Sequence, residues 1–512
     1  MNRKYVNWKT ETLHFKVHKK LTNKSATTMS IEAFPIVAYW HATKPVYSIT
    51  FESGSLNRFI TCGGDSKVKI WKFKTDSASE ENGNTPPHQL SGKTFTQLAQ
   101  ESVQKIEFLS SLVGFEKTVN VGSFSHSSSE SCKNNINVLA CAGDDGTIML
   151  WKKETSEDIK NGVKHSSIAM MAHDEFDDSS DNKENWYIWK KLRSTNTSEI
   201  YDISWSPDNE YLVAGCLDYS VKIFHVQSER CLYHSTSEKG HSNYVQGVEW
   251  DPLNELVITL GADRAMCVYK LQWNNKTGTL KDLKLINKII KGDIAGKSNF
   301  LFKNVDTSFF RRLKFSPCGS ILLAPAGIWK QTPTDGSQVL PDQPNESISN
   351  CVHIFSRANL PQKSSKPIGT IPNLNSRAVA VAFSPNFYKI ASQEDSLFNF
   401  AYRLVFAVAT LDQVLIYETD KLSCVAVVRN LHYSSIHDLA WNSDGSRILV
   451  SANDGFVSTI DLSKFAPRFG EILPNKSDFV KPFVPASAKS CSQLKSKPVS
   501  QPAVNVLVPR RK

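Results

Sequence analysis

The sequence predicts an all-β protein in which seven four-stranded sheets form a ring. Two repeated patterns lead to this prediction. The first is a β-branched run that follows an aspartate-containing turn, and it occurs five times. The second is a strand-like run that closes on an aromatic residue, and it occurs seven times. Elements copied in this way indicate a repeat architecture, because one four-stranded sheet cannot bury both of its faces alone.

The first pattern predicts a hairpin. In segments such as GGDSKVKIW and GDDGTIMLW, an aspartate stands six residues before a terminal large residue. An Asp-Gly or Asp-Ser turn leading into a β-rich run is typical of a hairpin. A catalytic carboxylate is not usually copied five times, so we expect a structural turn role for Asp65, Asp145, Asp218, Asp263 and Asp454. Asp144 has no counterpart in the other copies, and we interpret the Asp144-Asp145 pair as incidental.

The second pattern predicts the innermost strand of each sheet. The closing aromatics are Phe51, Phe124, Trp205, Trp250, Phe315, Phe383 and Trp441. The residue two positions earlier is apolar in every copy except at Gly122, and turn sequences such as SPDN and NSDG follow several copies. A unit of about 40–45 residues with four strands is the WD40 propeller blade. Only one copy has the Gly-His dipeptide, at Gly240 and His241, and none ends in Trp-Asp.

These repeats divide the chain into three parts. We expect a basic, disordered extension at residues 1–32, a seven-bladed WD40 propeller with polar insertions at 33–465, and a disordered Pro/Lys-rich tail at 466–512. The segment AFPIVAYW is expected to be an outer strand that closes the ring against the last blade. The expected insertions are 74–104, 154–185, 272–306, 331–350 and 386–400.

The net charge of +10 resides in the two ends of the chain. Residues 1–32 contain seven Lys or Arg and two Glu, and residues 466–512 contain nine Lys or Arg and two acidic residues. The ring between them therefore carries a net charge of −2. Basic tails either remain solvated or contact nucleic acid or acidic proteins. The N-terminal extension is either a weak mitochondrial presequence or a segment upstream of a true start at Met29.

Composition and motifs exclude several classes of function. No apolar run approaches eighteen residues, so no membrane span is predicted. The ten cysteines form no Cys-x-x-Cys pair, which favours reduced thiols in an intracellular protein. The signatures His-Glu-x-x-His and Gly-x-Ser-x-Gly are absent, and GDIAGKS lacks the first glycine of a P-loop. We therefore predict a protein that is not an enzyme and that uses no metal or cofactor.

Several segments resemble the middle, WD-repeat subunit of chromatin assembly factor 1, particularly its fungal members. They lie within residues 38–462 and include YWHATKPVYSITF, NKENWYIWKKLR, SFFRRLKFSPCGSILLAPAG and NLHYSSIHDLAWNSDG. The resemblance implies a non-enzymatic subunit of a nuclear chaperone that deposits histones H3–H4 on newly replicated DNA. Its partners would be the large and small subunits and H3–H4, with DNA contacted only indirectly and no membrane. The alternatives are the related chaperone of replication-independent deposition and a generic adaptor such as a ubiquitin-ligase substrate receptor.

The rim of the central channel is the predicted partner-binding surface. The residue four before each closing aromatic stands where an innermost strand begins, near this rim. Tyrosine and arginine are frequent interface anchors. The candidate residues are Tyr47, Tyr201, Gln246, Arg311 and His437. The alternative is that these side chains only pack the mouth of the channel.

Two further segments are candidates for contacts with partners. The acidic insertion AHDEFDDSSDNKEN either steers basic histones or is a solvated loop; its candidate residues are Asp174, Glu175, Asp177, Asp178 and Asp181. At the C-terminus the family carries a basic run followed by apolar and Thr-Pro residues, which resembles the segment that binds the anti-silencing H3–H4 escort chaperone. Here Arg510 and Arg511 start such a run but nothing follows Lys512. Either the sequence is cut short, or this protein lost the contact, or the VNVLV segment itself supplies it. We expect only weak direct binding of that chaperone.

Overall fold

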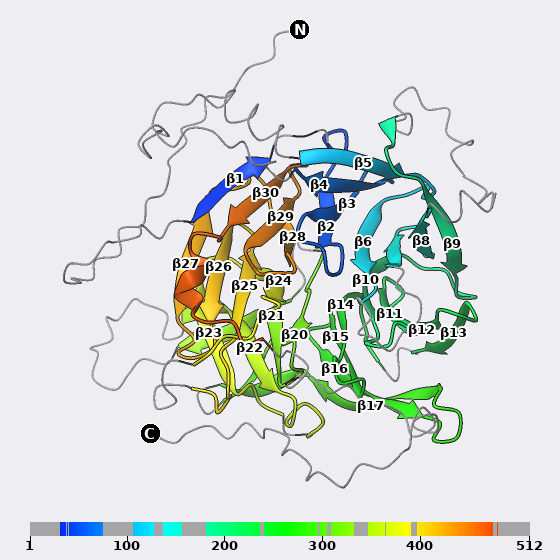
Figure 1. Ribbon diagram of the computed structural model, residues 1–512. Coiled ribbons are helices and arrows are strands. Elements are labelled where there is room, and N and C mark those ends of the chain that lie inside the picture. The colour runs from blue at the N-terminus through cyan, green and yellow to red at the C-terminus, as the bar shows by residue number, and fades with distance from the viewer. Residues whose placement is uncertain are drawn as a thin grey trace, which may run out of the picture.

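The fold is a closed ring of seven antiparallel sheets (Figure 1). The computed structural model describes residues 31–36, 38, 40–74, 106–126, 137–155, 181–235, 240–294, 297–304, 309–331, 347–363, 365–390, 397–474 and 479. In this part of the chain, seven sheets have four strands each and one hairpin lies apart from them. The predicted seven-bladed WD40 propeller is therefore confirmed.

Each of the first four blades follows the chain from the innermost to the outermost strand. Blade 1 contains β2 (Val46–Phe51), β3 (Arg58–Gly63), β4 (Val68–Phe73) and β5 (Ile106–Leu112). Blade 2 contains β6 (Val119–Phe124), β7 (Leu139–Gly143), β8 (Ile148–Lys153) and β9 (Trp186–Leu192). Blade 3 contains β10 (Ile200–Trp205), β11 (Tyr211–Cys216), β12 (Val221–His225) and β13 (Arg230–His234). Blade 4 contains β14 (Val245–Trp250), β15 (Leu256–Gly261), β16 (Met266–Trp273) and β17 (Leu280–Ile289).

The remaining blades include the one that closes the ring. Blade 5 contains β20 (Lys314–Phe315), β21 (Ile321–Gln331), β22 (Ser347–Ser356) and β23 (Gly369–Leu374). Blade 6 contains β24 (Ala378–Phe383), β25 (Val405–Thr410), β26 (Gln413–Glu418) and β27 (Cys424–Arg429). Blade 7 contains β28 (Ile436–Trp441), β29 (Arg447–Ala452), β30 (Val457–Asp461) and β1 (Glu32–Ile36).

Closure of the ring joins the two ends of the propeller. β1 pairs with β30 over five residues, from Glu32 opposite Asp461 to Ile36 opposite Val457, and the two strands lie side by side in Figure 1. The predicted closing strand is therefore confirmed, although it begins one residue before the predicted segment. A closed ring leaves no blade without neighbours on both faces, so every sheet face can be buried.

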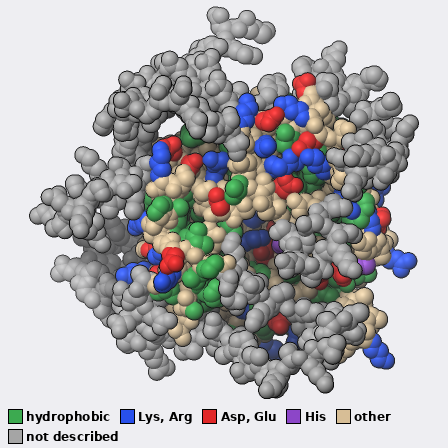
Figure 2. Space-filling model, viewed as in Figure 1, with side chains coloured by type: hydrophobic (Ala, Val, Ile, Leu, Met, Phe, Trp, Pro, Cys, Tyr) green, Lys and Arg blue, Asp and Glu red, His purple; other side chains and the backbone are tan. Residues whose placement is uncertain are grey.

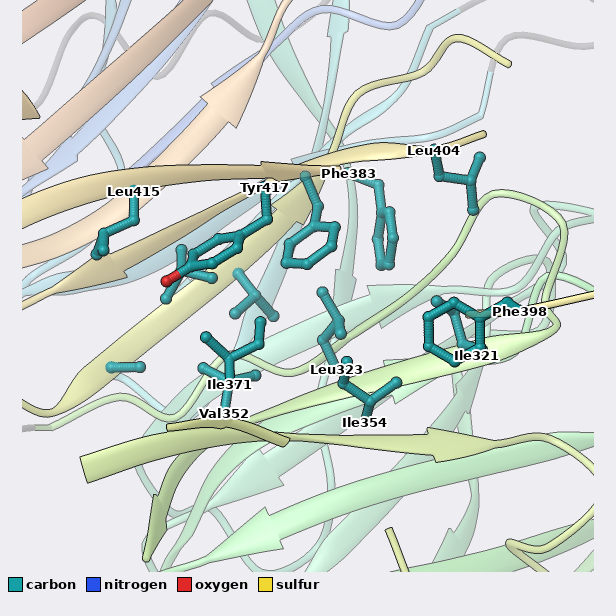
Figure 3. Close-up of a cluster of buried hydrophobic side chains, with 14 of the residues drawn as sticks. Ile321, Leu323, Val352, Ile354, Ile371, Phe383, Phe398, Leu404, Leu415 and Tyr417 are labelled. Carbon is teal, nitrogen blue, oxygen red and sulfur yellow. The ribbon is translucent and has the colours of Figure 1, made fainter. Parts of the chain in front are cut away.

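Packing between neighbouring blades forms the core. Figure 3 shows the contact between blades 5 and 6, where Ile321 and Leu323 of β21 face Phe383 of β24 and Tyr417 of β26. The alternating residues of each strand supply one such face, because successive side chains of a strand point to opposite sides of the sheet. The predicted closing aromatics occupy these interfaces: all seven are less than 10% exposed.

Gly122 breaks the apolar column for a steric reason. A Cβ atom at this position would lie 2.5 Å from Ile60 Cδ1 and 2.7 Å from Cys62 Sγ of blade 1. Cys62 and Cys141 are both fully buried beside it. The larger neighbours fill the space that the apolar residue occupies in the other blades.

Several expectations about individual segments were wrong. The expected insertion 331–350 includes the first four residues of β22. The expected insertion 272–306 contains β17, the outermost strand of blade 4, and the hairpin of β18 (Lys291–Ile294) and β19 (Lys297–Phe300). The FRRLKF run of blade 5 pairs with its own sheet only at Lys314 and Phe315. The ordered chain also continues beyond residue 465: a short 3-10 helix, η4 (Ala466–Phe469), is followed by a hydrogen bond from the Leu473 amide to the Phe387 carbonyl. Apolar contacts of Leu473 and Phe479 with the core of blades 5 and 6 hold this segment in place.

Candidate functional site

The two faces of the ring differ in which loops they carry. In blade 1, Val46 at the start of β2 pairs with Gly63 at the end of β3, so the β3–β4 turn lies at the end where β2 begins. The same pairing holds in the other blades with aspartate turns. We call the face with the aspartate turns and the starts of the innermost strands the upper face, and the opposite one the lower face.

The five aspartates of the first pattern lie in tight turns on the upper face. The residue that follows each one has a positive φ, between 63° and 82°, at Ser66, Gly146, Tyr219, Arg264 and Gly455. Four of the aspartates accept a hydrogen bond from the amide two residues ahead, at 3.1–3.2 Å. Side chains of this type stabilise a turn by bonding the backbone two residues on.

Histidines from the preceding loops support three of these turns. His241 lies 2.9 Å from Asp263 through Nδ1 and 2.7 Å from Thr259 Oγ1 through Nε2. His41 makes the same two contacts with Asp65 and Thr61, and His432 lies 3.2 Å from Asp454. The histidine rings are almost fully buried. Sequence reasoning noted only His241, because the other two histidines lack the preceding glycine.

An arginine crosses the central channel and joins five other blades. The Arg312 guanidinium lies 2.7 Å from Asp438 of blade 7, and it donates to the carbonyls of Tyr47 in blade 1 and Asn120 in blade 2 at 3.1 and 3.0 Å. Its Nε is 3.8 Å from Asp202 of blade 3. The Arg312 amide also donates to the Val379 carbonyl of blade 6. This residue therefore links the blades across the axis of the ring.

Burial shifts the pKa of one carboxyl beside this arginine. Burial raises the pKa of Asp202 to about 7, and the nearby Arg312 only partly opposes the shift. Asp202 accepts a hydrogen bond from the Val248 amide at 2.9 Å, and Asp438 accepts from the Ser48 hydroxyl at 2.9 Å and the Ile49 amide at 3.1 Å. The carboxylates therefore connect adjacent blades as well as pairing with the arginine.

Sequence reasoning missed Arg312 and its two carboxylates because it selected the residue four positions before each closing aromatic, not the residue three positions before it. Asp202, Arg312 and Asp438 all stand three residues before the closing aromatic, and two other copies have Gly247 and Ala380 there. Charged residues inside otherwise apolar strands indicate pairing, since an unpaired buried charge is costly. That signal was available in the sequence.

The predicted rim residues fall into two groups. Tyr47 and Tyr201 are half-buried, whereas Gln246, Arg311 and His437 are at most 7% exposed. In six blades a β-bulge displaces the pairing at this position, which re-aims the side chain relative to the regular alternation of the strand. The structure thus brings Tyr47 close to His437, with ring centroids 5.2 Å apart.

The expected surface role of Arg311 requires correction. This side chain is 1% exposed, and its guanidinium donates to the carbonyls of Gly261, Lys303 and Asn304 at 2.9–3.3 Å. Burial, and second the charge of Arg377, lower its pKa to about 10. Gln246 and His437 are buried as well, and burial lowers the pKa of His437 to about 4. These three side chains do not offer an exposed contact surface.

Exposed aromatic side chains gather on the upper face. In the described part of the chain, five aromatic residues are between 37% and 58% exposed: Tyr219, Phe300, Phe309, Tyr433 and Phe456. Tyr219 and Phe456 belong to aspartate turns, and Phe309 and Tyr433 precede innermost strands. Phe300 lies 3.6 Å from the Arg264 guanidinium of another aspartate turn. Clustered exposed aromatics are typical of protein–protein interfaces.

Charges of both signs accompany these features. Figure 2 shows Lys and Arg side chains interspersed with Asp and Glu over one face of the ring, and charged side chains in the recess at its centre. Asp144, interpreted from the sequence as incidental, lies in the β7–β8 turn of the upper face and accepts a hydrogen bond from Asn120 Nδ2 at 2.8 Å.

The acidic insertion is described only at its end. Asp174, Glu175, Asp177 and Asp178 lie outside the described residues, and Asp181 is exposed. The following segment, NKENW, is built into the fold. The amides of Lys183 and Glu184 donate to the Leu109 carbonyl of blade 1, and Glu184 pairs with Arg58 at 2.6 Å. This segment therefore fixes blade 2 to blade 1.

The described residues contain no recognisable nucleotide, metal or membrane-spanning element. The GDIAGKS sequence falls on the β18–β19 hairpin rather than in a strand–loop–helix unit. No group of three His, Cys, Asp or Glu in the described ranges could hold a metal ion. No helix among the described residues is long and apolar enough to span a membrane.

Comparison with known proteins decides the family. The model of the CAF1B/HIR1 β-propeller domain matches residues 94–465, and that of the WD domain, G-beta repeat, matches residues 36–72. The chain belongs to the CAF1B/HIR1 β-propeller family. The resemblance to the WD-repeat component of chromatin assembly factor 1 is thereby confirmed.

Several known relatives cover most of this family member. It is 36% identical to a chromatin assembly factor 1 subunit from Saccharomyces cerevisiae, over 84% of this chain and 86% of that protein. The protein of the same name from Schizosaccharomyces pombe is 29% identical, over 91% of this chain and 93% of its own length. Protein HIR1 of Yarrowia lipolytica is 24% identical over 82% of this chain but only 36% of its own length.

Proposed function

We propose that this CAF1B/HIR1 propeller is the WD40 subunit of a chromatin assembly factor 1 complex, a nuclear chaperone of histones H3–H4 in replication-coupled nucleosome assembly. The observation that carries the proposal is similarity along almost the whole length of two fungal proteins that are named as subunits of chromatin assembly factor 1. The role is not catalytic: the ring supplies a rigid surface, and the large and small subunits and H3–H4 are its partners. DNA is contacted only through them.

The second candidate is the subunit of the replication-independent chaperone. It is favoured by the family model, which covers both groups, and by 24% identity to HIR1 proteins. The lower identity and the small share of the HIR1 length support it less well. Affinity purification of the tagged chain from its own cells, followed by mass spectrometry, separates the two. Recovery of the large and small subunits of chromatin assembly factor 1 is expected, and recovery of the replication-independent chaperone alone would contradict the proposal.

The upper face is our proposed docking surface for the large subunit. The half-buried Tyr47 and Tyr201 stand at the channel mouth, and the exposed Phe309 packs against Tyr47 with ring centroids 6.5 Å apart. Large aromatic side chains that lose water on association are common binding hot spots. Arg311 is not included, because its removal would leave three backbone carbonyls without their donor and would test folding instead.

The test replaces Tyr47 and Tyr201 together by alanine. Binding of the purified large subunit, measured by calorimetry, should weaken by about 2 kcal/mol or more, which corresponds to about thirtyfold. Leu56→Ala is the matched control, since Leu56 is 46% exposed in the β2–β3 turn of the lower face. Unchanged affinity of the double variant, with an intact fold, would move the interface elsewhere.

The C-terminal tail is proposed to contribute only weakly to binding of the H3–H4 escort chaperone. Arg510 and Arg511 lie outside the described residues. A peptide of residues 495–512 should bind the escort chaperone more weakly than micromolar. Tighter binding that depends on both arginines would show that the segment is functional as it stands.

A further inference from the structure

The mouth of the channel on the upper face combines one carboxylate with several tyrosine rings. We propose that Asp144, Tyr47 and Tyr201 form a recognition site for a single arginine or lysine side chain of the large-subunit segment that docks there. The inference rests on the docking proposed above and names the chemistry of the contact. The proposed recognition site differs from the aromatic docking contacts because it depends on the Asp144 carboxylate.

Asp144 is held in place with one oxygen still available. Its Oδ1 accepts from Asn120 Nδ2 at 2.8 Å, and the same amide donates to the Ile200 carbonyl of blade 3 at 3.0 Å. Among the residues that the structure describes, no group donates a hydrogen bond to Asp144 Oδ2. An ionised carboxylate accepts several hydrogen bonds. A guanidinium or ammonium donor would use this free capacity.

Tyrosines on both sides of Asp144 complete the surroundings. Tyr47 and Tyr201 occupy the same bulged position in blades 1 and 3, which flank blade 2, where Asp144 lies. The charge of Asp144 acts on both phenols, in addition to burial, and raises the pKa of each. Tyr244 extends the surface, with its ring centroid 5.8 Å from that of Tyr201. Aromatic faces attract cations through the quadrupole of the ring.

Two buried arginines of the chain, Arg311 and Arg312, are engaged elsewhere. Arg312 pairs with Asp438 at 2.7 Å, and the Arg311 guanidinium is directed to three backbone carbonyls. The Asp144 Oδ2 atom therefore remains open at a surface bordered by aromatic rings. A half-buried carboxylate with one oxygen still open can accept a cation from outside.

The position of the chain ends favours a separate partner. Glu32 at the start of β1 pairs with Asp461 at the lower end of β30, so the N-terminal segment leaves the described ring at the lower face. After η4, the C-terminal segment contacts Phe387 and Tyr388, which follow β24 on the same face. Neither basic end begins beside the mouth. The large subunit is the occupant to which the proposal commits.

The first experiment removes the charge and keeps the shape. Asp144→Asn should weaken binding of the purified large subunit about tenfold at physiological salt, and less at high salt because charge effects are screened. Asp145→Asn is the matched control in the same turn, because Asp145 accepts from the Glu116 amide at 3.0 Å, which an asparagine oxygen can also do. Wild-type affinity of Asp144→Asn would overturn the inference.

The second experiment identifies the partner's side chain. A photo-crosslinking benzoylphenylalanine at position 244 should capture a large-subunit peptide that contains Arg or Lys. Changing that residue to Gln should weaken binding, and combining it with Asp144→Asn should cost no more than either change alone, as expected for two groups that interact directly. Independent, additive losses would overturn the inference.

Two comparisons keep the inference separate from the docking proposal. If Phe309→Ala and Tyr433→Ala weaken docking of the large subunit and Asp144→Asn does not, docking stands and the cation site is refuted. If none of the three has an effect, docking on the upper face is refuted as well. If Asp144→Asn weakens binding of H3–H4 and leaves the large subunit unaffected, the assignment of the mouth to the large subunit is overturned in favour of a histone.

Discussion

The arginine that crosses the channel gives the sharpest test of how the ring is held together. Arg312→Gln removes the ion pair with Asp438 at 2.7 Å and the donors to two carbonyls at 3.0 and 3.1 Å. Breaking a buried pair by removing one member typically costs 3–5 kcal/mol. The glutamine amide can restore about one hydrogen bond of roughly 1 kcal/mol, so we expect a net loss of about 2–4 kcal/mol. That is a large fraction of the stability of a typical folded protein.

The assay is urea unfolding followed by tryptophan fluorescence, with refolding checked at each step. Arg447→Gln serves as the control, because its pair with Asp461 is longer, at 3.3 Å, and about a quarter of each side chain is exposed. An exposed or half-exposed pair contributes about 1 kcal/mol or less. Arg312→Gln combined with Asp438→Asn should recover part of the loss, since the second change removes the unpaired carboxylate. The proposed role of Arg312 in linking the blades would be refuted by a cost for Arg312→Gln no greater than for the control, or by strict additivity in the double variant.

Three further predictions concern the core, the channel and the insertion. Gly122→Val should destabilise the ring by about 1–3 kcal/mol through overpacking. Gly64→Ala is the control and should not, because its added Cβ would have its nearest neighbours at 3.4 Å. Equal urea midpoints for the two variants would contradict the prediction. The pKa of the Asp202 carboxyl is about 7 in the folded protein and near 4 in the unfolded chain. Because the unfolded chain ionises at the lower pH, the free energy of unfolding should fall as the pH rises from about 4 to 7, by up to about 4 kcal/mol. Asp202→Asn should lack this part of the slope in urea unfolding at pH 4.5–8, and a profile parallel to wild type would disprove the assignment. The last change neutralises four acids of the insertion: Asp174, Glu175, Asp177 and Asp178. It should slow H3–H4 association in stopped-flow mixing at low salt and matter little at high salt. An unaltered salt dependence would favour a solvated loop.

Much of the fold could be predicted because its causes are local and repeated. The turn aspartates stand next to residues that adopt a positive φ, and the closing aromatics fill the spaces between blades. Each blade repeats the same solution, so one pattern located all seven inner strands. The closing strand followed from the same logic, since a ring with seven inner strands needs an outer strand for its last blade.

The candidate site was harder to predict because it depends on contacts between distant blades. The spacing placed Tyr47, Tyr201 and Arg311 at equivalent positions, but only the two tyrosines are partly accessible. The Arg311 backbone bonds the Gln246 carbonyl of blade 4 rather than its own sheet, which turns the side chain inward. The sequence favours an incidental role for Asp144 because the other blades have no counterpart. A charged residue found in one blade alone nevertheless gives that blade a chemistry that the others lack.

The sequence by itself determined the all-β architecture, the number of blades and the family, because strand periodicity, turn chemistry and characteristic segments are properties of short stretches. Only the tertiary structure decided which charged residues meet. Arg312 and Asp438 are 126 positions apart, and Asn120 and Ile200 are 80 apart, yet ring closure brings each pair into contact. The half-buried tyrosines and the buried arginines differ for the same reason: their exposure depends on bulges and on neighbouring blades, which no local sequence pattern predicts.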